Sequence, residues 1–329
     1  MRDMSEPEYQ KRFVVDLLYD GRRLDKFLRF KLHWRSRSEI RKKIERGEVL
    51  LNGKPAKPSQ TLKEGDEVVV LLDVPDVDLD KIPVETLFED EHIWIVNKPA
   101  GVMCHPTGRH IFGTVLNVLF KRMKERGELT EERKPHLCHR LDLHTSGVLV
   151  AAKTLEARRA LQEAFEKDQV AKFYLAVVEG IPEPREGKID APIAPIVGAP
   201  RLKMEVTPHG YPSLTLYRVV ERFACKNGAN FSLVECDLKT GRTHQIRIHL
   251  AHIGHPVVCD EIYGVRTKLQ RGDLGLVPSE EVIIERQALH AHRLIFKHPI
   301  TGKQLEVEAP LPEDMRRLLA ALRQASRSA

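Results

Sequence analysis

A run of apolar residues, Val148 to Ala152, follows the polar sequence His139-Arg140-Leu141-Asp142 and the turn-forming residues Thr145 to Gly147. A short, continuous apolar run bounded by turn residues predicts a buried strand. An ionised carboxylate is costly to bury without a partner. Asp142, which lies beside this strand, therefore either pairs with a cation or faces a cleft, where it can act as a reagent.

The length of the chain, 329 residues, suits two domains better than one core. Around Pro75 the sequence is acidic and lacks periodicity, as expected of a linker. We predict an N-terminal domain at residues 1–75 with its core at about 22–72, a linker at 76–82, and a larger domain at 83–325.

The N-terminal domain is predicted to combine two helices with a hairpin. Apolar residues at helical spacing begin a first helix near Arg23, and Ser36 or Ser38 can cap a second helix at Glu39 to Arg46. The strand Val49 to Leu51 then leads into Asn52-Gly53, a dipeptide that suits a tight hairpin turn. This small α/β module precedes everything else along the chain.

The second of these helices is strongly basic, and the chain as a whole has a formal net charge of +6. Arg41, Lys42, Lys43 and Arg46 are the candidates for contacts with the phosphates of a nucleic acid. A solvated, charged helix face is the simpler explanation of such a run. The charge therefore permits a nucleic-acid partner without requiring one.

The rest of the chain is rich in strands that do not alternate regularly with helices, which predicts an α+β domain with a mixed, largely antiparallel sheet. Strands are predicted at residues 91–96, 170–179, 214–223, 231–239, 288–296 and 304–308, and helices at 114–124, 155–167, 243–252 and 313–324.

Five cysteines, an odd number without a Cys-x-x-Cys pair, indicate a reduced, cytoplasmic protein in which cysteines mostly fill small apolar spaces. No apolar run approaches the ~18 residues of a membrane span. The chain lacks the glycine-rich loops that hold nucleotide phosphates, so we expect no cofactor.

Four histidines, His244, His249, His252 and His255, cluster before Cys259. Helical histidines three or four residues apart can bind zinc, but neither a His-Glu-x-x-His motif nor a cysteine pair completes a site here. We therefore expect hydrogen-bonding or phosphate-facing histidines and no metal.

A carboxylate nucleophile must be ionised, within reach of an electrophilic carbon, and placed beside a substrate that is held still. Arg247 is the candidate to keep Asp142 ionised, because an opposite charge within ~4–6 Å lowers the pKa of an aspartate by ~1–3 units. This pairing favours Asp142 as a nucleophile over Asp142 as a general acid.

Several motifs occur in one order along residues 83–319, and together they resemble the RluA-type family of pseudouridine synthases. They are the His139 to Asp142 sequence, Asn97 to Gly101, Lys172 to Ala176, Gly241 to Arg247, Arg286 to His292 and Lys297 to Pro299. The resemblance implies the pseudouridine synthase fold, an isomerase that converts uridine to pseudouridine in RNA, and no cofactor.

The resemblance also implies roles for individual residues. Asp142 matches the catalytic aspartate, which attacks C1′ of the target uridine or promotes elimination at C2′; both routes stay open. Tyr174 matches a tyrosine that stacks on the flipped uracil and can help to remove the C5 proton, although a buried tyrosine in a strand is more often a core residue. Arg140 would enter the space that the base leaves, with His139 beside it at the substrate.

The order of elements in the N-terminal module resembles a ribosomal protein S-four-like RNA-binding domain, and Gly113 to Asn117 is similar to the RluD-like branch of the family. That branch implies an enzyme that modifies large-subunit ribosomal RNA, whereas relatives with similar layouts act on transfer RNA. We expect the protein to be a monomer. Two other functions remain: a non-catalytic RNA-binding or ribosome-assembly protein, and a glycosidase-like hydrolase. The hydrolase normally needs two carboxylates, and the motif region offers one.

Overall fold

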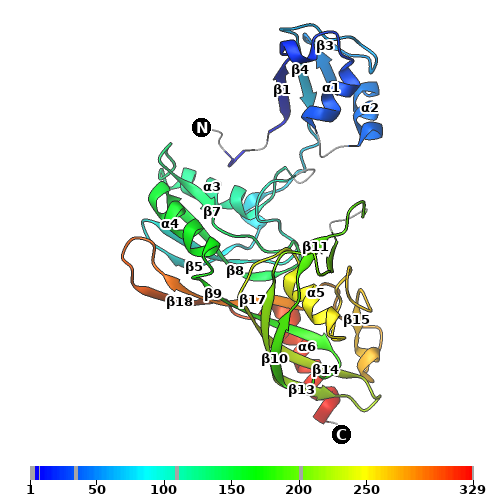
Figure 1. Ribbon diagram of the computed structural model, residues 1–329, viewed down its shortest axis with the longest axis vertical. Helices are drawn as coiled ribbons and strands as arrows, with labels where there is room; N and C mark the ends of the chain where they lie inside the picture. Colours follow the sequence, from blue (N-terminus) through cyan, green and yellow to red (C-terminus); the bar gives the residue numbers. More distant parts are fainter. Residues whose placement is uncertain (1–3, 7, 33–35, 108–110, 200–202, 328–329) are drawn as a thin grey trace. The chain divides into compact units, whose positions relative to one another are not determined.

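The computed structural model describes residues 4–6, 8–32, 36–107, 111–199 and 203–327 (Figure 1). The chain divides into two compact units, one of residues 1–82 and 105–127 and one of residues 83–104 and 128–329. The chain first passes between the units where the second domain was predicted to begin, but residues 105–127 return to the first unit. The predicted domain boundaries stay a prediction.

The first unit contains a small antiparallel sheet with the strand order β1 (Gln10–Val14), β4 (Glu67–Leu71), β2 (Val49–Leu51), β3 (Lys54–Pro55). Two helices, α1 (Leu24–Lys31) and α2 (Arg37–Glu45), bury their apolar faces in one core with this sheet. The short helix η1 (Leu17–Tyr19) contributes Tyr19 to the same core.

Local sequence determines where these elements begin and turn. Oγ of Ser36 accepts the Glu39 backbone N–H, and the Glu39 carboxylate accepts the Ser36 backbone N–H. Ser36, one of the two predicted cap residues, is therefore the cap, and α2 begins two residues earlier than expected. Asn52 and Gly53 have φ values of 50° and 76°, both left-handed, as the predicted tight hairpin between β2 and β3 requires.

A third helix, α3 (Val115–Glu125), and the short helix η2 (Leu79–Lys81) complete the first unit. Thr114 caps α3, and Asn117 on its first turn donates from Nδ2 to the carbonyl of Met4 at 2.7 Å. Lys124 pairs with Glu6 at 2.7 Å. The residues that precede β1 are thus fastened to a helix that lies far away in the sequence.

The second unit is organised around a ten-stranded sheet (Figure 1). Along its main path the strands are β10 (Glu186–Asp190), β13 (Leu214–Ala224), β14 (Asn230–Leu238), β9 (Ala171–Glu179), β17 (Leu289–Lys297), β8 (Ser146–Thr154), β6 (Ile93–Lys98) and β5 (Glu85–Glu89). Two further strands, β18 (Gln304–Glu308) and β7 (Arg133–Leu137), pair with β17 and β8. Every pair is antiparallel except β8 with β17.

Strand β17 lies between β8 and β9 and aligns residues that are distant in the sequence. Ala291 is opposite Gly147 on β8 and opposite Tyr174 on β9. The loop that carries Asp142 enters β8 at this point. The single parallel pair therefore brings the Asp142 loop and Tyr174 to the same part of the sheet.

Helices and two small sheets surround this centre. Helix α4 (Leu155–Glu166) packs on β8, and α6 (Glu313–Arg327) packs against β13 and β16 (Val282–Ile284), the partner of β15 (Leu269–Gln270). Helix α5 (Gln245–His252) contacts β12 (Met204–Val206), which forms a hairpin with β11 (Ile193–Pro195). The short helix η3 (Arg271–Leu274) follows β15. Among the described residues, no helix is both long and apolar enough to cross a membrane.

The predicted α+β class with a mixed, largely antiparallel sheet is confirmed. The helices and strands predicted in the second domain are all present, with ends that shift by up to three residues. The sequence missed the edge strands and short strands, including β1, β5, β7 and β10. These strands are short and half exposed, so they lack the long apolar runs that mark central strands.

Gly147 has a specific steric reason to be glycine, which can be tested. A Cβ atom there would lie 2.1 Å from the carbonyl oxygen of Ala291, and φ is +118°. We expect Gly147→Ala to destabilise the protein by roughly 3 kcal/mol or more, because backbone atoms of a central strand must move. Gly228→Ala is the control: it has φ +84° but no atom within 4 Å of the added Cβ, so only about 1–2 kcal/mol of strain is expected. Equal melting temperatures for the two variants would contradict the steric explanation.

Candidate active site

A cavity of about 430 Å³ opens beside Asp142 in the second unit. Tyr174 from β9, Leu289 from β17 and Arg247 from α5 line it together with Arg140. The loop at residues 139–142, β9 and α5, which carry the predicted site residues of this unit, thus meet around one space. Its size is that of an ordinary small-molecule or nucleotide site.

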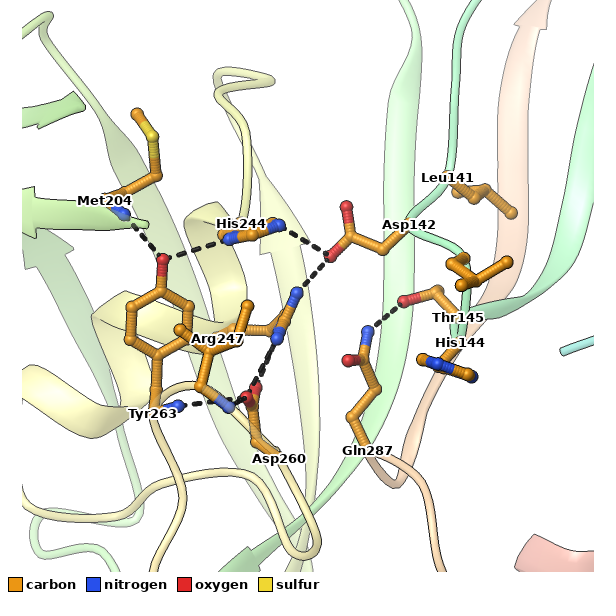
Figure 2. A network of polar contacts seen from close by, with 12 residues as sticks. Leu141, Asp142, His144, Thr145, Met204, His244, Arg247, Asp260, Tyr263 and Gln287 are labelled. Carbon is orange, nitrogen blue, oxygen red and sulfur yellow. Dashed lines mark hydrogen bonds and ion pairs between the residues drawn. The ribbon is translucent and has the colours of Figure 1, made fainter. Parts of the chain in front are cut away.

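The carboxylate of Asp142 is held from one side (Figure 2). Arg247 donates from Nη1 to Oδ2 at 2.9 Å, and Nε2 of His244 lies 3.9 Å from the same oxygen. The predicted ion pair between Arg247 and Asp142 is therefore present. Across the part of the chain that the structure describes, no hydrogen bond or ion pair involves Oδ1, so one oxygen is anchored and the other is open.

A second carboxylate, Asp260, fixes the Arg247 guanidinium. Arg247 donates from Nε to Oδ2 of Asp260 at 2.6 Å and from Nη2 to Oδ1 at 2.8 Å. Asp260 also accepts the backbone N–H groups of Ile262 and Tyr263. Burial disfavours the charged carboxylate, but these donors outweigh it and lower the pKa of Asp260. Burial also works against the Arg247 charge, and the two carboxylates more than compensate, so the pKa of Arg247 is raised.

The backbone on either side of Asp142 is pinned by two buried side chains. The Leu141 N–H donates to Sγ of Cys104 at 3.2 Å, and that thiol donates to the Leu141 carbonyl at 3.3 Å. Lys98 is fully buried and donates from Nζ to the Leu143 carbonyl at 3.0 Å. Burial lowers the pKa of Lys98 to about 8. Cys104 therefore holds the Leu141 backbone through hydrogen bonds, unlike the cysteines that only fill apolar space.

The residues after Asp142 are held in the same way. The Thr145 N–H donates to the Asp142 carbonyl at 3.1 Å, and Gln287 donates from Nε2 to Oγ1 of Thr145 at 2.8 Å (Figure 2). Arg286, which forms a bidentate pair with Asp314 on α6, donates to the His144 carbonyl at 3.0 Å. The backbone of the loop is therefore held by hydrogen bonds on both sides of Asp142, as a site that must align a nucleophile requires.

Tyr174 lies in the cavity wall with 9% of its surface exposed. Burial raises the pKa of Tyr174, and the charge of Asp142 raises it further. The phenol therefore stays protonated at neutral pH. This state suits a flat surface for stacking better than it suits a general base.

Arg140 and His139 occupy different environments although they are neighbours in the sequence. Arg140 is exposed and lines the cavity. His139 also lines it, but its Nε2 accepts the backbone N–H of Val150 at 3.0 Å and its ring stacks on Phe165 at 4.7 Å. Burial lowers the pKa of His139 to about 3, so it is uncharged. His139 can support the cavity wall but offers no positive charge to RNA.

His244 begins helix α5 in a left-handed conformation, with φ 57° and ψ 18°. Its Nδ1 lies 3.0 Å from the hydroxyl of Tyr263, and that hydroxyl accepts the backbone N–H of Met204 at 2.8 Å (Figure 2). Left-handed backbone is uncommon outside glycine and is often found at functional sites. Cys259, directly before Asp260, has the same conformation with φ 57°.

The other histidines of the predicted cluster have separate partners. His249 is buried between Oγ1 of Thr215 and the Ala191 carbonyl, and Nδ1 of His255 lies 2.9 Å from the Glu179 carbonyl. The predicted hydrogen-bonding roles of His249 and His255 are confirmed. Within the described ranges, no group of three or more His, Cys, Asp or Glu side chains could hold a metal ion.

The basic helix α2 of the first unit agrees only partly with the expected RNA contacts. Arg41, Lys42 and Arg46 are exposed, with Arg41 also paired to Glu45 at 2.7 Å. Lys43 is a correction: it is 3% exposed and donates to Glu48, to the Leu71 carbonyl and to Asp73. Its position on the inner side of the helix makes it a structural lysine instead of a phosphate ligand.

Sequence reasoning missed several residues that build the site. They are Lys98 and Cys104 in their clamping roles, Asp260, Tyr263 and Gln287. One signal was available, since Asp260 directly follows the His244 to Cys259 cluster. Its importance was hidden because only the fold places Asp260 on the guanidinium.

Two family models match this chain. The model described as RNA pseudouridylate synthase matches residues 92–252, which include Asp142, Tyr174 and Arg247. The model described as S4 domain matches residues 22–68 and includes helix α2.

Curated relatives match along nearly the whole chain. The ribosomal large subunit pseudouridine synthase D of Xanthomonas campestris is 40% identical over 93% of this chain and 90% of its own length. An RNA pseudouridine synthase of Bacillus subtilis, YlyB, is 37% identical over 92% of this chain and 94% of its own length.

Solved structures match about three quarters of the chain. Human RNA pseudouridylate synthase domain containing 4 is 28% identical with a TM-score of 0.57, over 73% of this chain and 93% of that one. Human RNA pseudouridylate synthase domain containing 1 is 26% identical with a TM-score of 0.54, and the match covers 76% of this chain and 98% of that one. The site around Asp142, the two matching models and relatives of this similarity lead to one conclusion: the chain belongs to the RNA pseudouridylate synthase family and isomerises uridine in RNA.

Proposed function

We propose that this enzyme converts uridine to pseudouridine in large-subunit ribosomal RNA. The support is the extent of the match to relatives named ribosomal large subunit pseudouridine synthase D, which reaches 93% of this chain in both Xanthomonas campestris and Xylella fastidiosa. Transfer RNA is the alternative substrate. We further propose that the protein acts as a monomer in the cytoplasm, off the membrane, and needs neither metal nor cofactor.

The geometry of the Asp142 carboxylate carries the proposed mechanism. With Oδ2 anchored by Arg247, Oδ1 is the oxygen that faces the substrate. It either adds to C1′ of the ribose or takes the proton from C2′, and in both routes the N1–C1′ bond breaks. The uracil, which keeps the bonding electron pair on N1, then turns, and C5 bonds to C1′. In the first route the Asp142–C1′ ester bond breaks in this step, and in the second route the proton taken from C2′ returns to C2′. The C5 proton then leaves and N1 gains a proton. No atom is added or lost overall.

The cavity around Asp142 can hold the detached base during this turn. Tyr174 offers a flat, uncharged ring for stacking in the cavity wall. Arg140, exposed at the same cavity, is suited to enter the stack where the uridine has left, which offsets part of the few kcal/mol that base extrusion requires. His139 supports this wall as an uncharged residue.

The substrate can be identified by mapping pseudouridines in total RNA from cells with and without this gene. Loss of one or more sites in large-subunit ribosomal RNA, restored by the gene on a plasmid, supports the proposal. Loss of sites only in transfer RNA would replace the proposed substrate by the alternative one.

We predict that Asp142→Asn abolishes isomerisation but leaves RNA binding nearly intact. Asparagine has the same shape and can still contact Arg247, but it is neither a nucleophile nor a base. Tritium release from RNA labelled at C5 of uridine measures turnover, and a gel-shift titration measures affinity. Measurable turnover by the asparagine variant would show that Asp142 is not the reagent.

We predict that Arg247→Met lowers turnover far more than RNA affinity. Removing one partner of a buried ion pair typically costs ~3–5 kcal/mol, and here it leaves Asp142 and Asp260 without their shared cation. The matched control is Arg218→Met, which removes a surface pair with Glu235 and should leave turnover unchanged. Wild-type turnover in the Arg247 variant is the contrary result.

We predict that Lys42→Gln together with Arg46→Gln weakens RNA binding and flattens its salt dependence. Each lost phosphate contact should reduce the log–log slope by about 0.7–0.9. Lys226→Gln, an exposed lysine in the loop between β13 and β14, is the control for a change of net charge. Equal slopes for the double variant and the wild-type protein would mean that helix α2 does not contact this RNA.

A further inference from the structure

His244 lies at the junction of three parts of the site. Its Nδ1 meets the Tyr263 hydroxyl at 3.0 Å, and its Nε2 lies 3.9 Å from Oδ2 of Asp142. The side chain is 10% exposed and forms no capping hydrogen bond with its own helix. Left-handed backbone is costly for a residue other than glycine, and the contacts of the imidazole are the interactions that can offset this cost.

The proton on the Tyr263 hydroxyl can be located from its neighbours. A backbone N–H can only donate, so the Met204 N–H at 2.8 Å uses a lone pair of this oxygen. Burial raises the pKa of Tyr263, so the phenol keeps its proton. Nδ1 of His244 is the acceptor within reach of that proton.

The carboxylate of Asp142 also favours a His244 tautomer in which Nδ1 accepts the hydrogen bond and Nε2 carries the proton. If Nδ1 of His244 accepts the Tyr263 hydrogen bond, the neutral imidazole carries its proton on Nε2, the nitrogen that lies nearer to Oδ2 of Asp142. The opposite tautomer would place the Nε2 lone pair against a negatively charged oxygen. Burial lowers the pKa of His244, and the Arg247 charge lowers it further against the pull of Asp142, so the ring is neutral.

We propose that His244 is a positioning residue for Asp142, with its tautomer fixed by Tyr263. Its Nε2–H and the Arg247 guanidinium both attract Oδ2, so Oδ1 is turned toward the ribose. We expect the 3.9 Å separation to shorten when substrate binds, as catalytic hydrogen bonds often do. This inference rests on the proposed role of Asp142 as the reagent.

The source of this orientation is the β11–β12 hairpin. Met204 on β12 supplies the N–H that occupies Tyr263, and its side chain packs with Ile193 of β11 and Ile248 of α5 in one apolar cluster that Tyr263 joins. A segment outside the motif regions therefore determines which nitrogen of His244 carries the proton.

The test is a double-mutant cycle on the single-turnover rate of pseudouridine formation. Tyr263→Phe keeps the ring beside Arg247 but removes the hydroxyl, and we expect a rate about tenfold lower with little change in RNA affinity. His244→Gln places an amide N–H near the position of Nε2 and should retain most of the rate, whereas His244→Leu should lose about tenfold.

The combined variant distinguishes positioning from simple loss of structure. A glutamine has no tautomer to fix, so Tyr263→Phe should have almost no effect on the rate when His244→Gln is already present. If Tyr263→Phe instead lowers the rate by the same factor in both backgrounds, the tyrosine acts only through general packing and the proposal is wrong. Full activity of His244→Leu would also overturn it.

Two matched controls accompany the cycle. Tyr217→Phe removes another buried hydroxyl, one that donates to the Pro184 carbonyl, and His252→Gln changes an exposed histidine on the same helix. Both should keep the wild-type rate. Activity of Asp142→Asn would refute the proposed role of Asp142 itself, a result separate from any outcome of the cycle.

Discussion

The buried guanidinium of Arg247 is the group on which the site depends. Asp260 binds it through Nε and Nη2, and Nη1 donates to Asp142. One cation between two carboxylates leaves a negative charge in excess. Asp260 has no exposed side-chain surface, whereas Asp142 retains 23%, so the excess charge lies on the carboxylate that faces the cavity. Because an unpaired buried charge is very costly, the Asp142 carboxylate needs hydrogen-bond donors in addition to Arg247. His244 is placed to be one of them.

Rigid backbone around Asp142 complements this electrostatic arrangement. The residues that flank it are held by Cys104, Lys98 and Thr145, and none of these contacts uses the carboxylate itself. The main chain is thus fixed by one set of partners and the side chain by another. Such a division allows the carboxylate to respond to substrate while its Cα stays in place. Close approach of β17 at Gly147 fixes the end of the same loop.

In helix α2 of the first unit, the charge of a lysine does not determine whether its side chain is exposed. Lys42 and Lys43 are adjacent in a basic helix, yet one is exposed and the other is enclosed by Glu48, Asp73 and the Leu71 carbonyl. Composition alone treats the two alike. The helical period of 3.6 residues turns them to different sides, so only part of a basic run is available to phosphates.

The sequence by itself determined the fold class, the motif residues and the pairing of Arg247 with Asp142, because apolar periodicity and turn chemistry are local and the family motifs are contiguous. It also predicted the turn at Asn52 and narrowed the cap of the second helix to Ser36 or Ser38, of which Ser36 is the cap. Only the tertiary structure decided the parallel pairing of β8 with β17, the docking of Asp260 on Arg247 and the link from Met204 through Tyr263 to His244. These hydrogen bonds join segments that are far apart in the sequence, and three-dimensional packing determines which groups become partners. The local periodicity of the sequence contains no information about such pairs.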